Sequence, residues 1–430
     1  MSEELIAVEK EIIGEALTSD RAYQLVESLC RKFGSRFAGS DEEREAASFL
    51  AGKMRNFGLE EVELKPFEYQ GWQRGSTELF WLDQDDKPHR VDCIGLPYSP
   101  EGKVEAELID LGLGTPAEFS LEEGKISGKI VLVSSERPLY ARENMHRRDK
   151  YLRAVEAGAA GFIWMRGAPG YLEETGGLPH DAPIPAAGIS REAGFRLQEM
   201  LVKGKLRVRL AASHQKAPTT SYNVIGSLPG RNPEKKKLIA GAHYDGHDIA
   251  EGALDNGAGT AVVMEAARLL AQRSEVLERS VDFVLFGAEE VELVGSSSFV
   301  AEVAEQADLD DYQFMINLDG GPGRPGSKLG IALQGWPKLV PFFKRMAAEM
   351  GLENLAVGVS HSAHSDMYPF SEKGVPSGYL SALEEMATGR NWGHTRADTL
   401  DKLEVEKLRE DALLLSRILL RAANMQDWPV

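Results

Sequence analysis

From about residue 230 onward, short apolar runs alternate along the chain with segments of helical length. The runs predicted to be buried strands are 238–242 (LIAGA), 281–288 (VDFVLFGA), 314–318 (FMINL), 330–333 (GIAL), 356–359 (AVGV) and 378–381 (GYLS). Helices are predicted between them, chiefly over 259–271 and over 403–424. Continuously apolar strands that alternate with helices indicate an α/β fold with a mixed, mostly parallel central sheet flanked by helices.

The N-terminal part of the chain shows a helical pattern with a recognisable beginning and end. Ser40 and Glu43 stand at the spacing of a capping box, which satisfies free N–H groups in the first turn of a helix. Apolar residues then recur at helical spacing as far as Phe57, and Gly58 supplies a stop. Residues 62–69 mix strand formers with charges and predict extended chain.

Residues 95–215 have a different pattern, in which turn-rich segments with many prolines separate short β-like runs. These runs are AELIDLG (106–112), GKIVLV (128–133) and, after a helical stretch, AGAAGFIWM (157–165). The pattern predicts a small, β-rich α/β domain inserted at 95–215. The flanking parts, 1–94 and 216–430, then form one larger, discontinuous domain.

The charge balance restricts the partners of the protein. Acidic residues outnumber basic residues 67 to 49, which gives a formal net charge of -18. This balance argues against nucleic acid or an anionic membrane as a partner, because phosphates would be repelled. Most of these acids are expected to form a solvated surface, and the open question is which of them gather at a site.

Targeting and redox signals indicate a cytoplasmic protein. The first residues, MSEELIAVEKEIIGEAL, carry acids where a signal peptide needs a basic end and a long apolar core. No apolar run approaches the roughly 20 residues that span a bilayer. Two cysteines, Cys30 and Cys93, cannot staple a chain of 430 residues and are expected to be reduced.

Acidic and imidazole side chains follow three of the predicted strands directly. Ligands of such sheets bind at the carboxyl ends of the strands, so these side chains are expected to meet at one edge. The residues are His243, Asp245, Glu289, Glu290 and Asp319, with Asp255 nearby at the start of a helix. Five carboxylates cannot share one crevice in ionised form unless a positive charge offsets them. A metal centre supplies that charge.

Imidazole combined with carboxylate suits zinc, and also manganese or cobalt, whereas a structural zinc site would use cysteine. His394, in the segment GHTRADTLDKL (393–403), offers a further imidazole. Two histidines, a bridging acid and two terminal acids then serve two metal ions, and Glu289 is left over as a base. Paired ions roughly 3.5–4 Å apart polarise a carbonyl and lower the pKa of a shared water, so the predicted chemistry is amide hydrolysis.

Each of these residues also has an ordinary structural interpretation. An adjacent Glu289–Glu290 pair is usually a solvated surface, and Asp255 beside a glycine run could serve only as a helix cap. His243 and His247 compete for the same ligand position, and spacing alone does not separate them. The combination argues for a site more strongly than any one member does.

These residues together resemble the co-catalytic zinc exopeptidases. The matching segments are H-x-D at 243–245, ALDNGAG at 253–259, Glu-Glu at 289–290, NLD at 317–319 and GHT at 393–395. That group includes bacterial leucyl-type aminopeptidases, plasma glutamate carboxypeptidase and the transferrin-receptor ectodomain. Further similarity lies in GSRFAGSDEERE (34–45) and in SDMYPF followed by GVP (365–376), and the middle segment resembles the protease-associated domain.

The resemblance implies a role for each matching residue and two Zn²⁺ ions per chain. Asp255 bridges the ions, His243 and Asp319 complete one site, and Glu290 and His394 complete the other. Glu289 is the general base that moves a proton from the bridging water to the leaving amine. Asp245 holds the His243 ring in place, and Asp398 supports the His394 loop. A cis peptide between Asp255 and Asn256 is also implied.

One feature of this sequence departs from the family pattern. Some members place an aromatic hydroxyl or an imidazole directly before the last histidine ligand, where it assists the oxyanion. This chain has Asn391, Trp392 and Gly393 at those positions. The residues that could substitute are His361, His364 and Tyr379, and the sequence does not choose among them.

The substrate class follows from the charge of the predicted crevice. Spare acids suit the free α-ammonium group of a peptide, so we expect an aminopeptidase. A carboxypeptidase or dipeptidase would instead need a cation for the terminal carboxylate, and Arg324, Arg390 or Arg396 could provide one. A non-catalytic, receptor-like binding module is disfavoured, because such relatives lose metal ligands and this chain keeps all of them. A homodimer is expected from the family alone.

Overall fold

The structure is a computed structural model. It describes residues 2–136, 145–306, 309–382 and 392–430. The described chain divides into two compact units. The first comprises residues 2–69, 220–306, 309–382 and 398–430, and the second comprises residues 70–136, 145–219 and 392–397. We expected domain boundaries near residues 95 and 215, whereas the division falls inside two long strands, β1 (Glu60–Leu82) and β8 (Arg207–Leu228).

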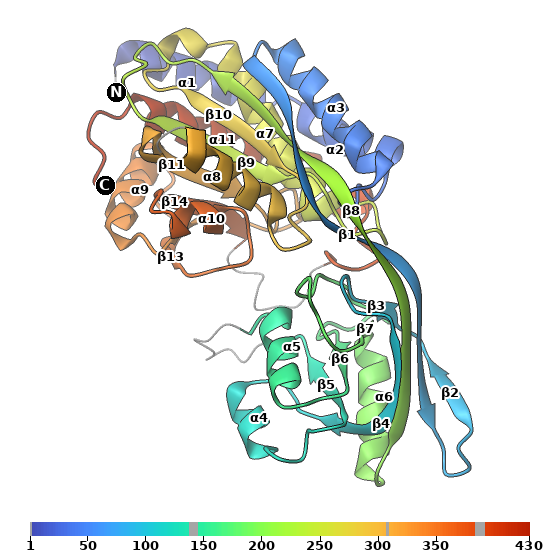
Figure 1. The fold of residues 1–430 in the computed structure, drawn as a ribbon. Helices are drawn as coiled ribbons and strands as arrows, with labels where there is room; N and C mark the ends of the chain where they lie inside the picture. The colour runs from blue at the N-terminus through green and yellow to red at the C-terminus, as the bar shows by residue number, and fades with distance from the viewer. Residues whose placement is uncertain (1, 137–144, 307–308, 383–391) are drawn as a thin grey trace. The chain divides into compact units, whose positions relative to one another are not determined.

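The first unit is built on a mixed sheet whose strand order is β13-β12-β14-β11-β9-β10-β8 (Figure 1). Its other strands are β9 (Lys237–His243), β10 (Val281–Phe286), β11 (Tyr312–Leu318), β12 (Leu329–Gln334), β13 (Val357–Ser360) and β14 (Ser377–Ala382). Strand β9 lies between β10 and β11 and is parallel to both, whereas β8 and β12 pair antiparallel with their neighbours β10 and β14. The predicted α/β class is therefore confirmed, with a strand at each predicted apolar run.

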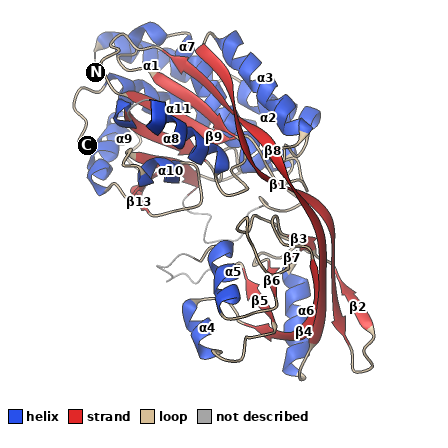
Figure 2. Ribbon diagram, viewed as in Figure 1, coloured by secondary structure: helices blue, strands red, loops and turns tan. Residues whose placement is uncertain are grey.

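Helices cover both faces of this sheet (Figure 2). They are α1 (Glu3–Ala16), α2 (Arg21–Phe33), α3 (Asp41–Phe57), α7 (Ala258–Ala271), α8 (Val294–Gln306), α9 (Val340–Glu349), α10 (Met367–Glu372) and α11 (Val405–Asn424). Short helical turns lie at Ala253–Gly257, Ser274–Val276, Leu309–Asp311, Pro337–Leu339 and Leu400–Lys402. Helix α7 packs against β9, α2 and α11, which explains why its sequence has few polar positions.

The core on the opposite face joins α8 and α10 to the central strands. Phe299 of α8 and Phe370 of α10 pack against Phe286 of β10, with ring centroids 5.8–6.1 Å apart. Met315 of β11 and Ile239 of β9 belong to the same buried cluster. The central strands β9, β10 and β11 are therefore held rigidly from both sides, which fixes the position of the loops that follow them.

Helix α3 begins with half of the predicted capping box. The Ser40 hydroxyl accepts the backbone N–H of Glu43 at 3.1 Å, as predicted. The Glu43 carboxylate does not return to Ser40, because it is fully buried and accepts the backbone N–H of Gly39 at 2.6 Å and the Ser221 hydroxyl at 2.5 Å. Gly58 ends the helix with a left-handed φ of 90°, as predicted.

The second unit contains a small sheet of β-rich α/β type, with strand order β4-β5-β6-β7-β3. Its elements are β3 (Ile94–Gly95), β4 (Gly102–Asp110), β5 (Ile130–Ser134), β6 (Gly161–Met165), β7 (Ala186–Ile189), α4 (Pro116–Leu121), α5 (Arg147–Glu156) and α6 (Arg191–Val202). Strands β4 to β7 are parallel, and β2 (Pro88–Val91) forms a hairpin with β1. Leu132, Ile163 and Leu197 lie in its core.

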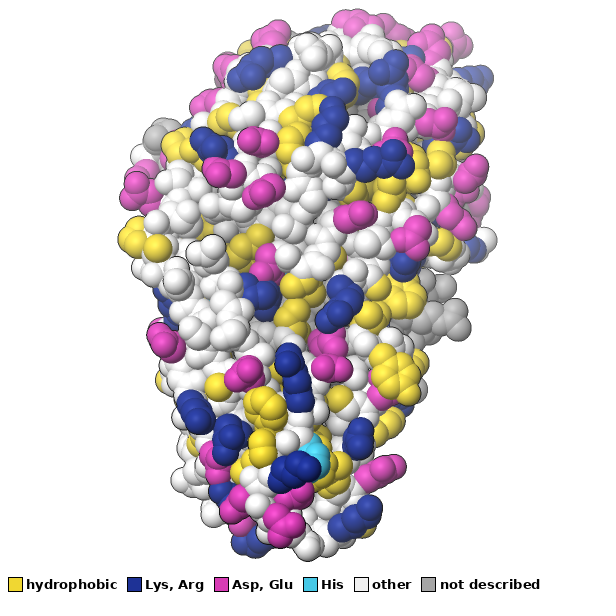
Figure 3. Space-filling model, turned by 90° about the vertical axis from the view of Figure 1, so that its right-hand side faces the viewer, with side chains coloured by type: hydrophobic (Ala, Val, Ile, Leu, Met, Phe, Trp, Pro, Cys, Tyr) yellow, Lys and Arg dark blue, Asp and Glu magenta, His cyan; other side chains and the backbone are white. Residues whose placement is uncertain are grey.

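Acidic and basic side chains are interleaved on the face of the molecule drawn in Figure 3. Opposite charges also pair within the second unit, where Glu105 of β4 forms ion pairs with Arg207 and Arg209 of β8. The surplus of acid is therefore distributed rather than gathered into one single-sign patch on this face. Among the described helices, none combines the length and the apolar character that crossing a membrane would require.

Candidate metal centre

The carboxyl ends of β9, β10 and β11 meet at one edge of the first unit's sheet. His243 is the last residue of β9 and stands opposite Phe286, the last residue of β10. Asp319 directly follows β11, and Glu289 follows β10 after a two-residue loop. Because all three strands are parallel, the topology brings these side chains together, although they come from segments far apart in the sequence.

His243 lies at the centre of a carboxylate cluster and is only 1% exposed. Its Nε2 atom is 3.3 Å from Asp255 Oδ1 and 3.6 Å from Asp319 Oδ1, and its Nδ1 atom is 3.4 Å from Asp245 Oδ1. Burial by itself lowers the pKa of the imidazole, but the charge of Glu289 and the contacts with the other carboxylates outweigh it and raise that pKa well above its ordinary value. The cluster therefore carries an excess of negative charge that a bound cation would balance.

Asp245 connects the end of β9 to the loop after β10. Its carboxylate is fully buried and accepts the backbone N–H of Glu289 at 3.1 Å and that of Glu290 at 3.3 Å. The preceding residue, Ala288, has a left-handed φ of 55°, so the chain turns sharply at this point. Asp245 thus holds both neighbouring acids as well as lying beside the His243 ring.

Glu289 is 9% exposed and belongs to the first group of converging ligand atoms. Single ligand atoms of His243, Glu289 and Asp319 all lie within 4.8 Å of one another. Burial raises the pKa of the Glu289 carboxyl well above its ordinary value, His243 opposes this shift, and the charges of Asp319 and Glu290 add to it. A carboxyl with such a high proton affinity, at this place, can accept and return a proton.

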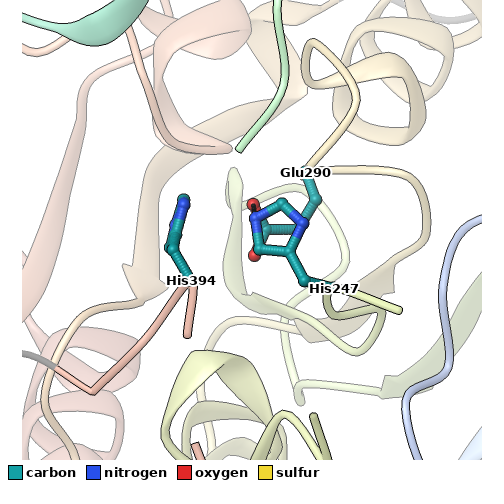
Figure 4. Close-up of side chains that lie close together, drawn as sticks. All are labelled: His247, Glu290 and His394. Carbon is teal, nitrogen blue, oxygen red and sulfur yellow. Dashed lines mark ion pairs between the residues drawn. The ribbon is translucent and has the colours of Figure 1, made fainter. Parts of the chain in front are cut away.

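A second imidazole and carboxylate lie together within the first unit, those of His247 and Glu290, and Figure 4 draws them together with His394. His247 and Glu290 belong to the first unit, and His247 Nε2 is 2.9 Å from Glu290 Oε2. His394 is one of the residues grouped with the second unit, where its backbone oxygen accepts the N–H of Thr175 at 2.9 Å. Its role as a ligand stays a prediction.

Two buried charged residues, Asp398 and Arg36, form hydrogen bonds with the backbone of the Asp255 loop and the residues just before it. Asp398, expected to support the His394 loop, uses its carboxylate to accept the backbone N–H groups of Leu254 at 2.7 Å and of Asp255 at 3.1 Å. Burial and the charge of Asp255 raise the pKa of Asp398 to about 7, although these hydrogen bonds lower it. The peptide bond between Asp255 and Asn256 is cis, as the resemblance implied.

Arg36 is a site residue that the sequence analysis did not single out. Its guanidinium is fully buried and donates to the backbone oxygens of Tyr244 at 2.8 Å, Glu251 at 2.7 Å and Gly252 at 2.8 Å. It therefore ties together the segments that carry His243 and Asp255. The segment GSRFAGSDEERE had marked this region, but its sequence offered no sign of which backbone groups Arg36 would contact.

Ser365 is a second residue that the analysis did not single out. Its hydroxyl donates to Asp319 Oδ2 at 2.6 Å and accepts the side-chain N–H of Asn317 at 2.8 Å. The neighbouring Asp366 is fully buried, and burial raises the pKa of its carboxyl to about 7. Ser365 is the first residue of the SDMYPF segment, whose similarity to the family did not indicate a role. These contacts show that the segment begins beside Asp319.

The residues considered for oxyanion stabilisation have different surroundings. His361 is exposed, and His364 is half-buried next to Ser365. Tyr379 packs against the α8–α10 core, and its hydroxyl lies 3.1 Å from the Ser360 hydroxyl. Among the described residues, neither group of converging ligand atoms includes His361 or His364.

The arginines considered for a substrate carboxylate also differ. Arg324 is 8% exposed, and burial lowers the pKa of its guanidinium while the charges of Asp255 and Asp398 oppose that shift. Arg396 is largely exposed and forms an ion pair with Glu173 at 2.6 Å. Arg390, like Asn391, lies outside the described residues.

The donor atoms of both groups fit divalent metal ions. Each group combines imidazole nitrogen with carboxylate oxygen, the set that suits zinc, manganese or cobalt. The adjacent residues Glu289 and Glu290 fall into different groups, so the two candidate sites are neighbours. Asp255, beside His243, lies at the same edge of the sheet.

Comparisons with known proteins agree with this geometry. Residues 223–418 match Peptidase family M28, and residues 104–197 match the PA domain. The chain is 28% identical to Aminopeptidase YwaD of Bacillus subtilis (strain 168), over 95% of this chain and 86% of that protein. It is 25% identical to Carboxypeptidase Q of Homo sapiens, over 98% of this chain and 89% of that protein.

A solved structure shows the same fold. The peptidase M28 precursor from Shewanella amazonensis SB2B superposes with a TM-score of 0.81 at 25% identity, covering 99% of this chain and 98% of that one. These findings confirm the resemblance that the strand-end residues and the middle segment had indicated. The chain is therefore a metallopeptidase of peptidase family M28 that carries a PA domain.

Proposed function

We propose that this protein is an aminopeptidase that binds two Zn²⁺ ions and removes N-terminal residues from peptides. The observation that carries the proposal is the convergence of two groups of nitrogen and oxygen ligand atoms at one strand-end edge, with Glu289 and Glu290 divided between them. A mononuclear or structural site would not need two adjacent groups of this kind.

The ligand assignment rests on the family resemblance, and the contacts of His243 with Asp255 at 3.3 Å and with Asp319 at 3.6 Å support it. Asp255 would serve both ions, His243 and Asp319 would hold one of them, and Glu290 and His394 would hold the other. Two zinc ions in these positions would polarise the scissile carbonyl and lower the pKa of a shared water. Manganese or cobalt would fit the same donors.

Glu289 acts as the general base in this proposal. Its carboxylate takes a proton from the attacking water and returns it to the nitrogen of the leaving amine. The buried environment raises the pKa of its carboxyl, which favours acceptance of the proton from the water. Asp245 orients the base through the Glu289 backbone N–H.

The acidic character of the centre supports a substrate with a free α-ammonium group. Glu289, Glu290 and Asp319 each supply a carboxylate there, so a peptide N-terminus would meet several negative charges. Aminopeptidase YwaD, with which the chain shares 28% identity over 95% of its length, bears a name that agrees with this specificity.

A panel of free and N-acetylated peptides, measured together with metal content, tests the proposal. The expected result is two metal ions per chain, cleavage of the first residue of free peptides and loss of cleavage on acetylation. Equal cleavage of free and acetylated peptides would refute aminopeptidase specificity. A protein that retains no more than one ion under any condition would refute the two-ion centre.

A carboxypeptidase is the second candidate, and one observation favours it. Arg324 is buried, and the charges of Asp255 and Asp398 raise the pKa of its guanidinium against the effect of burial. A buried arginine suits the terminal carboxylate of a peptide. The similarity to Carboxypeptidase Q, at 25% identity, points the same way. The same peptide panel, extended with C-terminal amides, separates the two activities.

A further inference from the structure

His247 has no role in the mechanism given above, yet it is buried beside Glu290, one of the proposed metal ligands. Its Nε2 atom is 2.9 Å from Glu290 Oε2, and both side chains are 4% exposed. It stands four residues after His243, in the loop that follows β9. A buried imidazole that directs a nitrogen at a carboxylate ligand is either a hydrogen-bond donor to that carboxylate or a ligand of the same ion.

The composition of the two groups favours a ligand. The first group takes its imidazole, His243, from the first unit, which also supplies both of its carboxylates. His394, the imidazole that the family resemblance assigns to the other ion, belongs to the second unit, whereas His247 and Glu290 both belong to the first. His247 therefore gives the first unit an imidazole–carboxylate pair at each of its two candidate sites.

The electrostatic surroundings support the same choice. The Glu290 backbone contacts the buried carboxylate of Asp245, and the Glu290 carboxylate lies near that of Glu289. A neutral imidazole bound to a divalent ion brings no further negative charge to this cluster, whereas it adds a strong nitrogen donor. Imidazole is also the commonest protein ligand of such ions.

We propose that His247 is a ligand of the ion that Glu290 binds. This inference rests on the two-ion centre of the proposed function. It assigns to that ion His247, Glu290, His394 and the bridging Asp255, and to the other ion His243, Asp319 and Asp255. The two ions are therefore held by unequal sets of protein ligands, and the ion at Glu290 depends on His247.

Zinc titration of the full-length protein tests this assignment. Metal-free wild type and the variant H247Q are titrated with Zn²⁺ against a chromophoric chelator, and Co²⁺ spectra are recorded in parallel. A glutamine can still donate a hydrogen bond to Glu290 but is a poor zinc ligand. We expect H247Q to keep one ion at wild-type affinity and to bind the other about 10-fold to 100-fold more weakly. Its Co²⁺ spectrum is expected to change as well.

Two control variants locate the effect. H243Q is expected to weaken the other ion, so that its Co²⁺ spectrum differs from that of H247Q. H214Q removes a buried histidine of the second unit and is expected to bind both ions as wild type does. Thermal unfolding of the metal-free variants checks that each is folded, and H247A supplemented with imidazole replaces H247Q if that variant unfolds.

The outcomes are distinct. Binding of both ions by H247Q with wild-type affinity and an unchanged Co²⁺ spectrum would overturn the assignment and leave His247 as a hydrogen-bond donor. Failure of imidazole to strengthen metal binding by H247A would do the same. If the wild type itself binds fewer than two ions, the two-ion centre fails, and this result is separate from any difference between wild type and H247Q.

Discussion

The carboxylate of Asp245 accepts the backbone N–H of Glu289 at 3.1 Å, so the residue two places after His243 fixes the loop that carries the proposed base. The other oxygen of the same carboxylate accepts the N–H of Glu290 at 3.3 Å. The buried carboxylate of Asp245 thus connects the loop after β9 to the loop after β10. The family resemblance had assigned Asp245 only to the His243 ring, which lies 3.4 Å away.

The double contact predicts the effect of Asp245→Asn. An amide of the same shape keeps one acceptor oxygen and loses the other, so one backbone N–H of the Glu289–Glu290 loop loses its partner. We expect zinc affinity and turnover to fall by about 10-fold to 100-fold, with little change in fold. Turnover at saturating zinc, measured beside thermal unfolding, checks this. Wild-type turnover would show that Asp245 does not position the loop.

Glu289→Gln separates proton transfer from metal binding. The amide is similar in size and cannot accept a proton at neutral pH, while the proposed ligands are left intact. We expect both ions to remain and turnover to fall by about two to four orders of magnitude. Elemental analysis and turnover, measured on the same preparation, test both halves of the prediction. Turnover within a few fold of wild type would exclude Glu289 as the base.

Asp255→Ala and Asp319→Ala form a matched pair. A bridging carboxylate serves both ions, whereas Asp319 is assigned to one. Asp255→Ala is therefore expected to weaken both ions together, and Asp319→Ala only the ion at His243. Zinc stoichiometry after dialysis against a graded series of chelator concentrations distinguishes the two cases. Retention of two ions by Asp255→Ala would contradict bridging.

The local pattern of the sequence predicted the strands well, because an apolar run of strand length is a local signal. The sheet edge could also be predicted, since parallel strands with acids directly after them must present those acids together. His243 and Asp319 are found within 3.6 Å of each other for this reason. The pattern did not show that β1 and β8 each run for more than 20 residues, because their sequences mix charged and apolar positions.

Long-range contacts account for what the sequence could not predict. Arg36 donates to backbone oxygens near Asp255 that lie more than 200 residues away in the sequence. Asp398 accepts backbone N–H groups of the Asp255 loop that lie more than 140 residues away. A backbone acceptor or donor has no sequence identity, so spacing and motif cannot indicate it. The choice between His243 and His247 was open for a related reason, and the structure places the two in different groups of ligand atoms.

Arg324→Leu tests the carboxypeptidase alternative. If Arg324 bound the terminal carboxylate, its loss would weaken free-acid peptides by about 10-fold or more and leave C-terminal amides unchanged. Under the aminopeptidase proposal, Arg324 does not bind the terminal carboxylate of the substrate, and both kinds of peptide are expected to be affected equally. Values of kcat/KM for paired acid and amide substrates decide this. Arg396→Leu, which removes an exposed arginine, is the control.

Glu43 gives the protein a pH-dependent stability that does not require the metal ions. Burial and the charge of Asp245 raise the pKa of its carboxyl to about 8 from an ordinary value of 4.5, against the hydrogen bonds from Ser221 and Gly39. Between these two pH values the folded state keeps a proton that the unfolded state has lost. The contribution of Glu43 to stability is therefore fully present below pH 4.5 and declines as the pH rises toward 8, by at most about 1.4 kcal/mol per pH unit.

Glu43→Gln should remove this dependence, because the amide resembles the protonated carboxyl and does not titrate. We expect the stability of the variant relative to wild type to rise between pH 5.5 and pH 8 by about 1–3 kcal/mol. The unfolding free energies of both proteins are measured by urea unfolding in excess chelator. Subtracting one from the other cancels the titration of the metal ligands that the two proteins share. A difference in unfolding free energy that stays constant over this range would show that Glu43 is ionised in the folded protein throughout.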